Sequence, residues 1–286
     1  MYIKSGYKTI TPIQISNALF LLENKTLSKG ALQIYFACFS LVAIREAANR
    51  AQKQRSKKGR IIPSYRLKEL SKATGLPLRA IKKELSNLKT LGLLTFSESE
   101  ILITKTFFLG SEELLESLSG RRSPKRPIPV PRSILRFISH SKKLSVTKTL
   151  LAYITRGLNI SRTGEIKGQG SVKCSWIADT MNLSLRSVKS ARKELIGLGI
   201  ITADTGSFQW KLNKTGAYFT INLSWISQES AAYQSKLASN NREMKVIPES
   251  KFAPPIPQKC HNFAPPYKDK KTPYGSKYQK TLSAAQ

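Results

Sequence analysis

The chain has 286 residues, 40% of them hydrophobic, and carries 48 Lys and Arg against 17 Asp and Glu, a formal net charge of +31. This length and composition allow two domains with real cores, and the charge indicates a polyanionic partner, either nucleic acid or an anionic membrane. No run approaches the roughly 18 apolar residues of a membrane span. Three scattered cysteines (Cys38, Cys174 and Cys260) favour a reducing cytosol over a disulfide framework, and the first eight residues lack a secretory-signal pattern.

The first 60 residues predict two helices followed by a basic segment. Thr11-Pro12 is a cap followed by a proline that opens a helix, and Leu27-Ser28 starts a second helix that is apolar enough for a core position. Residues 45–60 carry seven Lys or Arg and no apolar stripe, so we expect the helix to pass into a basic loop. This loop is either an arm that contacts phosphates or a solvated linker, and the sequence leaves both open.

Residues 67–103 predict a helix-turn-helix followed by a β-hairpin, the wing. Gly75-Leu76-Pro77 forms a tight turn between the two helices. The second helix has one apolar stripe, formed by Ile81, Leu85, Leu88 and Leu91. Gly92 ends that helix as a C-terminal cap, and the apolar runs 93–96 and 101–103 form the hairpin.

Residues 111–131 predict the boundary between two domains. Ser111 caps a short acidic helix that runs to residue 118. Residues 121–131 hold four prolines and four basic residues, a composition that resists both helix and sheet and is typical of a stiff linker. We therefore expect an N-terminal domain in residues 1–118, a linker in residues 119–131 and a C-terminal domain in residues 132–226.

The second domain repeats the first. When the sequence is shifted by 107 positions, residues 69–95 align without a gap with residues 176–202, and eight positions are identical. At four further positions apolar residues fall on apolar residues, which indicates two copies of one unit: Leu70, Ile81, Leu93 and Leu94 align with Ile177, Val188, Ile200 and Ile201. Leu27-Ser28 also matches Leu144-Ser145 at an offset of 117. The duplication therefore covers whole domains, and the ten extra residues of the first copy are most economically placed in residues 45–60.

The second copy predicts the same elements in the same order. Residues 132–139 and 145–156 form helices, and residues 161–171 are a glycine-rich segment without P-loop spacing, which we interpret only as a connection. Ser184 caps the second helix of the helix-turn-helix, and Gly199 ends it. Its apolar stripe is Val188, Ala191, Leu195 and Leu198. A longer wing follows, with strands at residues 200–202, 208–212 and 217–223.

The faces opposite the two apolar stripes carry polar and basic side chains that suit the major groove of DNA. Arg pairs bidentately with guanine, whereas Lys serves more often as a point charge for phosphate. The expected DNA-binding residues are Arg79, Lys82, Lys83, Ser86 and Asn87 in the first copy, Arg186, Ser187, Lys189, Ser190 and Lys193 in the second, and Lys211 and Lys214 in the second wing. A single helix of this kind would be interpreted as an ordinary solvent-exposed helix. Two such helices in the same helix-turn-helix frame favour DNA binding.

Residue patterns for catalysis and metal binding are missing. The two histidines, His140 and His261, are far apart in sequence, so the chain lacks the histidine pair of a metal-dependent nicking enzyme. Cys260-His261 has no partner cysteines at zinc-site spacing, and the sequence shows neither a carboxylate cluster for two metals nor a Walker motif. We therefore expect a binding protein that positions and deforms DNA, not an enzyme, with no metal and no cofactor.

Two winged-helix domains in one chain of about this size resemble the replication initiators of bacterial plasmids and integrative elements. The resemblance covers roughly residues 10–225 and rests on the frames 67–95 and 174–202 and on the wing sequence QWKLNKTGAYF at residues 209–219. It implies that each domain recognises part of a repeated origin site. It also implies that the protein switches between a repressing dimer and an origin-opening monomer and recruits the host helicase machinery. Only the DNA-contacting role maps onto residues of this chain.

The sequence thus predicts an α+β protein, mainly α with small β-hairpin wings, built of two tandem winged helix-turn-helix domains. Residues 227–286 are polar, basic and proline-rich and predict a disordered tail. Phe-Ala-Pro-Pro occurs twice in that tail, either as a motif for a partner or as low-complexity sequence.

Replication initiation is the leading function, with double-stranded DNA as the partner, a cytoplasmic location and no membrane partner. A homodimer and contact of the tail with host replication machinery stay open. The alternatives are a transcriptional regulator of a mobile element or phage and a non-specific architectural DNA-binding protein. Regulators usually contact palindromes as homodimers with one DNA-contacting helix per chain, so two such helices per chain favour an initiator.

Overall fold

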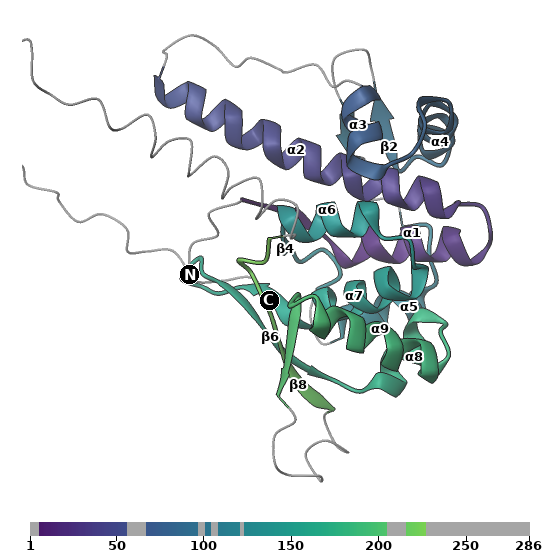
Figure 1. Ribbon diagram of the computed structural model, residues 1–286, viewed down its shortest axis with the longest axis vertical. Helices are drawn as coiled ribbons and strands as arrows, with labels where there is room; N and C mark the ends of the chain where they lie inside the picture. Colours follow the sequence, from purple (N-terminus) through teal and green to yellow (C-terminus); the bar gives the residue numbers. More distant parts are fainter. Residues whose placement is uncertain are drawn as a thin grey trace, which may run out of the picture. The chain divides into compact units, whose positions relative to one another are not determined.

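The computed structural model describes residues 6–55, 67–96, 101–103, 108–120, 123–204 and 216–226. These residues form a mixed α/β protein in which helices alternate with small antiparallel sheets (Figure 1). All of them belong to one unit of the chain, Met1–Lys236. None of the helices in these ranges is both long and apolar enough to cross a membrane. The predicted tail, the basic residues 56–60 and the predicted strand 208–212 lie outside the described residues.

The first repeat contains the helices and the hairpin that its sequence predicts. Its elements are β1 (Tyr7–Ile10), α1 (Pro12–Glu23), α2 (Lys29–Arg55), α3 (Leu67–Thr74), α4 (Leu78–Thr90), β2 (Leu94–Phe96), β3 (Ile101–Ile103) and α5 (Glu112–Ser119). Strands β2 and β3 pair antiparallel, with Leu94 opposite Ile103. The predicted order of helix, turn, helix and hairpin is therefore confirmed for this repeat, whereas β1 is an element that the sequence analysis does not predict.

Capping groups determine where these helices begin and end. At the start of α1, the Gln14 N–H donates to Thr11 Oγ1 (3.3 Å) and the Thr11 N–H donates to Gln14 Oε1 (2.9 Å), which is a reciprocal capping box. Gly92 and Gly199 follow helices α4 and α9 (Leu185–Gly197) with φ of 67°. This left-handed conformation costs glycine little and ends a helix. The predicted caps at Thr11, Gly92 and Gly199 are confirmed.

The second repeat adds a four-stranded antiparallel sheet to the same order of helices. Its elements before α9 are β4 (Ile128–Pro131), α6 (Arg132–His140), α7 (Leu144–Gly157), β5 (Leu158–Ile160), β6 (Ile166–Val172) and α8 (Cys174–Met181), and those after it are β7 (Ile201–Asp204) and β8 (Ala217–Ile221). The strands lie in the order β5-β6-β8-β7. Ser184 caps α9 by accepting the Ser187 N–H (3.1 Å), as the sequence predicts.

The expectation that residues 161–171 are only a connection is wrong. Most of this segment is β6, which pairs with β5 on one side and with β8 on the other. A Cβ atom at Gly168 would lie 2.9 Å from the Ile221 carbonyl oxygen, and one at Gly170 would lie 3.0 Å from the Phe219 ring. Because β8 approaches this strand so closely, glycine is the residue that fits at both positions. Glycine is therefore abundant in this segment because β8 packs closely against β6, and not because the segment is an irregular connection.

The expectation that residues 121–131 resist both helix and sheet is wrong for the last four of them. These residues are β4, which is buried and pairs antiparallel with β1. Pro129 lies opposite Thr9 and Pro131 opposite Tyr7, and a two-stranded sheet has free edges on which the missing N–H of proline is tolerated. The pairing ties the start of the second repeat to the start of the first. The division of the chain into domains at residues 119–131 stays a prediction.

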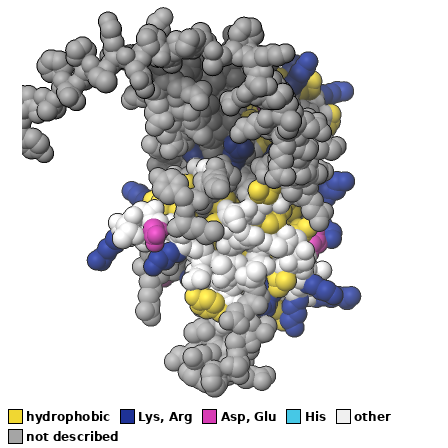
Figure 2. Space-filling view, turned by 60° about the vertical axis from the view of Figure 1, so that its left-hand side comes forward, with side chains coloured by type: hydrophobic (Ala, Val, Ile, Leu, Met, Phe, Trp, Pro, Cys, Tyr) yellow, Lys and Arg dark blue, Asp and Glu magenta, His cyan; other side chains and the backbone are white. Residues whose placement is uncertain are grey.

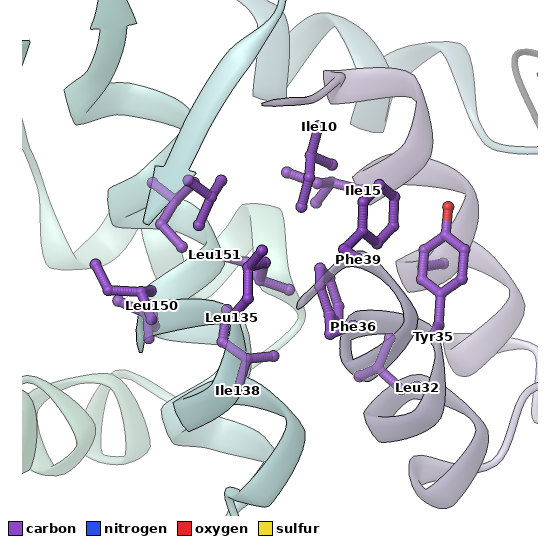
Figure 3. Packing of buried hydrophobic residues seen from close by; sticks show 14 of the residues in the cluster. Ile10, Ile15, Leu32, Tyr35, Phe36, Phe39, Leu135, Ile138, Leu150 and Leu151 are labelled. Carbon is purple, nitrogen blue, oxygen red and sulfur yellow. The ribbon is translucent and has the colours of Figure 1, made fainter. Parts of the chain in front are cut away.

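One buried apolar cluster runs through both repeats. In α2, Tyr35 and Phe39 are each 1% exposed and pack edge to face, with ring centroids 5.1 Å apart. Helix α2 packs along α6 of the other repeat, and Figure 3 shows Phe36 beside Leu135 and Ile138 of α6. Because a fully buried side chain of this size contributes about 1.5–3 kcal/mol, this cluster both stabilises the fold and joins the repeats.

Polar contacts cross the same junction in both directions. The buried Lys148 of α7 forms an ion pair with Glu23 at the end of α1 (Nζ to Oε1, 3.0 Å) and donates to the Met181 carbonyl oxygen (2.7 Å). Conversely, Gln33 Nε2 of α2 donates to the Ser141 carbonyl oxygen directly after α6 (3.0 Å). Helix α7 thus bonds to the end of α1, and helix α2 bonds to the end of α6, so each repeat contributes one long helix to these contacts.

We expect Lys148→Met to lower the free energy of unfolding by about 1–3 kcal/mol, because it leaves the Met181 carbonyl without its donor and Glu23 without its cation. Urea denaturation of the full chain measures the change. Lys142→Met removes an exposed lysine and serves as the matched control, with a shift below about 0.5 kcal/mol. Equal stability of the two variants would show that the ion pair does not hold the repeats together.

Candidate nucleic-acid interface

Helices α4 and α9 present matching polar faces to solvent. Four exposed residues of α4 form what we call the α4 face: Arg79, Lys82, Lys83 and Ser86. The α9 face is formed by Arg186, Lys189, Ser190 and Lys193, which are also exposed. In each helix the four residues follow the spacing i, i+3, i+4, i+7 and so share one side. A shift of 107 positions superposes the two sets residue by residue, so the duplication places equivalent residues at equivalent positions.

Burial of the opposite sides fixes which way these faces point. Three residues of each predicted stripe are buried, Ile81, Leu85 and Leu88 in α4 and Val188, Ala191 and Leu195 in α9, and Leu91 is half-buried against the core. The prediction is wrong for Leu198, which lies just after the end of α9 and is 42% exposed. Helix α4 packs against α2, and α9 packs against α7. Rotating either helix would expose its stripe and bury several cations, which is strongly unfavourable. Each face is therefore held outward by the core beneath it.

The cations of the two faces are available to a partner outside the chain. No ion pair or hydrogen bond engages their charged groups with another of the residues that the structure describes. Figure 2 shows Lys and Arg side chains projecting around the rim of the face in view, with few Asp or Glu side chains among the coloured residues. Such basic surface attracts polyanions and releases counterions when it neutralises phosphates.

Two predicted DNA-binding residues instead have partners within the chain. Asn87 is half-buried, and its Nδ2 donates to the Thr26 carbonyl oxygen in the turn before α2 (3.4 Å). Ser187 is half-buried, and its Oγ lies 2.8 Å from Ser184 Oγ at the start of α9. Both side chains therefore help to hold their helices in place and do not belong to the exposed faces.

The side chain at position 87 attaches α4 to the turn before α2, and the side chain at the equivalent position 194 attaches α9 to the residue before α7. Glu194 forms an ion pair with Lys143 directly before α7 (2.8 Å). Glu194 corresponds to Asn87, and Lys143 corresponds to Thr26, at the two offsets of the duplication. The contact is therefore retained while its chemistry changes from a neutral hydrogen bond to an ion pair. It orients α4 and α9 in the same way on their cores.

The predicted wing residues Lys211 and Lys214 lie outside the described residues. The strands that lead to them, β7 and β8, pair antiparallel with Thr202 opposite Thr220. On β8, Tyr218 is 48% exposed. The base of this hairpin thus lies on the same sheet as β6, next to α9 in the chain.

Two further lysines, which the sequence analysis does not select, stand beside the α4 face. Lys68 and Lys72 of α3 are exposed and, together with Leu78 at the start of α4, line a shallow hollow of about 320 Å³. Their spacing of i and i+4 on a short helix was a signal available in the sequence. In the second repeat the corresponding residues are Ser175 and Asp179, so this basic extension belongs to the first repeat.

Two other arginines, Arg156 and Arg192, contact side chains within the second repeat and contribute to its packing. Arg156 of α7 lies over the Trp176 ring, with its guanidinium carbon 4.1 Å from the ring centroid. Arg192 of α9 is half-buried, and its Nη1 lies 3.8 Å from Cys174 Sγ. Burial raises the pKa of the neighbouring Tyr153 to about 12, although the charge of Arg192 opposes that shift. Tyr153 therefore stays a neutral phenol at physiological pH, and this cluster is part of the core.

A cleft of about 730 Å³ is lined by residues of α5, α7 and the segment before β4, among them Glu113, Glu116, Arg126 and Arg156. Because carboxylates and guanidinium groups both line it, it lacks the single-sign field that attracts a charged ligand. Within the described ranges, no group of three or more His, Cys, Asp or Glu side chains is placed to hold a metal ion. The pair of helix faces is therefore the candidate site.

Comparison of the chain with protein-family models, with curated proteins and with solved structures gives no match in any of the three.

We expect Arg186→Ala and Lys189→Ala to change the free energy of unfolding by less than about 0.5 kcal/mol, because both side chains are exposed and support nothing in the core. Leu195→Ala, on the buried stripe of the same helix, should lower it by about 2–5 kcal/mol. Urea unfolding of the three variants measures these changes. A large loss in either face variant would mean that the face stabilises the fold.

Proposed function

We propose that this chain is a sequence-specific double-stranded DNA-binding protein with two winged helix-turn-helix heads, the first built on α3 and α4 and the second on α8 and α9. The observation that carries the proposal is the duplicated basic face, in which Arg79 and Lys82 recur as Arg186 and Lys189 at equivalent exposed positions. The major groove, about 12 Å wide, admits an α-helix, and the first residues of that helix meet base edges. The formal net charge of +31 supports neutralisation of phosphates.

The order of the elements supports the assignment of the second head. Along the chain, α7, β6, α8, α9, β7 and β8 follow one another, and the three strands pair in the order β6-β8-β7. The hairpin β7–β8 then follows α9 directly, as the wing of a winged helix does. In the first repeat, α2, α3, α4, β2 and β3 follow the same sequence of helices and hairpin. In this arrangement a wing contacts the backbone beside the groove, which sets the register of the helix on the duplex.

Two related but non-identical heads in one chain favour a replication initiator. Lys83 and Ser86 of the first face are replaced by Ser190 and Lys193 in the second, so the heads suit similar but unequal half-sites. A transcriptional regulator usually binds a palindrome through identical heads of a homodimer, and a non-specific architectural protein needs no duplicated arginine at the start of a helix.

The proposed biological setting is the origin of a plasmid or integrative element. The protein would act in the cytoplasm by binding and deforming DNA, without a catalytic step, a metal or a cofactor. A homodimer and contact of the basic tail with host replication proteins are further parts of this proposal. They follow from the resemblance to plasmid initiators.

Selection of binding sites from random duplexes tests the proposal. We expect tandem direct repeats next to an A+T-rich segment, whereas a short palindrome would favour a regulator and the lack of any motif would favour an architectural protein. On the selected duplex, a log–log plot of the association constant against salt should have a slope of about −5 to −9, as expected for roughly 6–10 neutralised phosphates. A slope near zero, or equal affinity for every duplex, would contradict two specific heads.

Arg186→Ala and Lys189→Ala should have different effects on recognition. Loss of Arg186, near the start of α9, should relax the preference at one base pair and cost about 1–3 kcal/mol of binding free energy. Loss of Lys189 should weaken binding to all sequences alike and reduce the salt slope by about 1. Repeating the selection with each variant measures both effects. Lys125→Ala, an exposed lysine outside both faces, is the control, and identical specificity profiles for the two face variants would contradict this placement of α9.

A further inference from the structure

Each of the two helices begins with an exposed leucine. Leu78 is the first residue of α4 and Leu185 the first residue of α9, and they are 41% and 45% exposed. Both are exposed, whereas Leu76 and Leu183, two positions earlier, are half-buried and pack against the buried cluster. Core packing therefore accounts for Leu76 and Leu183 but not for the exposed pair, Leu78 and Leu185.

These leucines lie next to the part of the two faces that is identical in both copies. Leu78, Arg79 and Lys82 recur as Leu185, Arg186 and Lys189, whereas Lys83 and Ser86 of the α4 face are replaced by Ser190 and Lys193 in the α9 face. The identical part is the N-terminal end of each helix, which is the end that meets base edges in a major groove. A single exposed leucine is ordinary, but the same leucine beside the same arginine in both copies indicates a shared contact.

The major groove offers one kind of apolar partner to such a side chain. Its edges present hydrogen-bond donors and acceptors, and thymine adds a C5-methyl group. A leucine placed against a donor or acceptor would remove water from it without replacing the hydrogen bond, which is unfavourable. Against a thymine methyl, the same leucine buries apolar surface on apolar surface. Leucine at this position therefore discriminates in favour of thymine.

The surroundings of Leu78 fit this placement. The hollow that it borders also carries Lys68 and Lys72 of α3, so cations for the phosphate backbone lie beside an apolar contact to the bases. The next residue on the helix, Arg79, is exposed on the same end and can reach an adjacent base. One turn of helix thus combines an apolar contact, a base-pairing guanidinium and phosphate-binding ammonium groups.

We propose that Leu78 and Leu185 each contact the C5-methyl group of a thymine beside the base that Arg79 or Arg186 contacts. The inference rests on the proposed DNA binding and adds a specific requirement to it. The two half-sites share a thymine at the same position, and Leu78 and Leu185 determine specificity there.

Deoxyuridine tests this contact because it removes only the methyl group from thymine. Binding of the full chain is measured on the selected duplex with each thymine replaced in turn by deoxyuridine. We expect one position in each half-site at which the replacement raises Kd about fourfold, the effect of losing one buried methyl group. In Leu185→Ala the penalty at one half-site disappears and the penalty at the other stays, and Leu78→Ala gives the converse. Leu185→Met keeps an apolar contact and retains both penalties.

Ile196→Ala is the matched control, because Ile196 is 40% exposed on the same helix but near its other end. This variant should leave both penalties unchanged. The leucine contact is overturned, with sequence-specific binding intact, if no thymine replacement weakens binding or if both penalties survive in both alanine variants. If the unmodified chain prefers no duplex, the proposed function itself fails and the leucine contact fails with it.

Discussion

The packing of α2 against α6 is the interaction on which the rest of the structure depends. These helices belong to different repeats, and their apolar side chains form one buried cluster. Helix α4 packs on α2, and α9 packs on α7, which shares the same cluster. The two polar faces are therefore carried by one core. If each face contacts DNA, packing sets their separation, and the preferred spacing of two half-sites is a property of the fold.

The contacts around this core follow the duplication. Strand β1 precedes α1 and strand β4 precedes α6, and these equivalent strands pair antiparallel with each other. Lys148 reaches Glu23 at the end of α1, while Gln33 reaches the end of α6. Equivalent elements therefore meet at β1 and β4, whereas α2 packs on α6, which is not its counterpart. Because the ion pair and the amide contact differ in strength and solvation, the two copies are held by related but unequal bonds.

The basic residues divide into two groups by what surrounds them. Arg156 and Arg192 lie against an aromatic ring and a thiol, and their side chains contribute to packing within the second repeat. The residues of the two faces are exposed and engage no described acidic group. The ion pair between Lys143 and Glu194 is exposed and of the kind that adds little stability, so its effect is to orient α9. The half-buried arginines and the Lys143–Glu194 pair thus act within the fold, whereas the cations of the two faces are free to bind a partner.

The sequence by itself determined the helices, their caps and the hairpin strands around the candidate site, and tertiary structure decided strands β1, β4 and β6. Helix periodicity and the caps at Thr11, Ser184, Gly92 and Gly199 are local properties, which is why α4, α9 and their exposed faces could be predicted. Strands β4 and β6 contain proline or glycine, whose local preferences oppose strands, and they form because β1 and β8 supply partners far away in sequence. The same reason explains Asn87, whose acceptor lies 61 residues away in the chain. A pattern of residue types reports which side of a helix is polar, and only the packed neighbours decide which of those polar groups already has a partner.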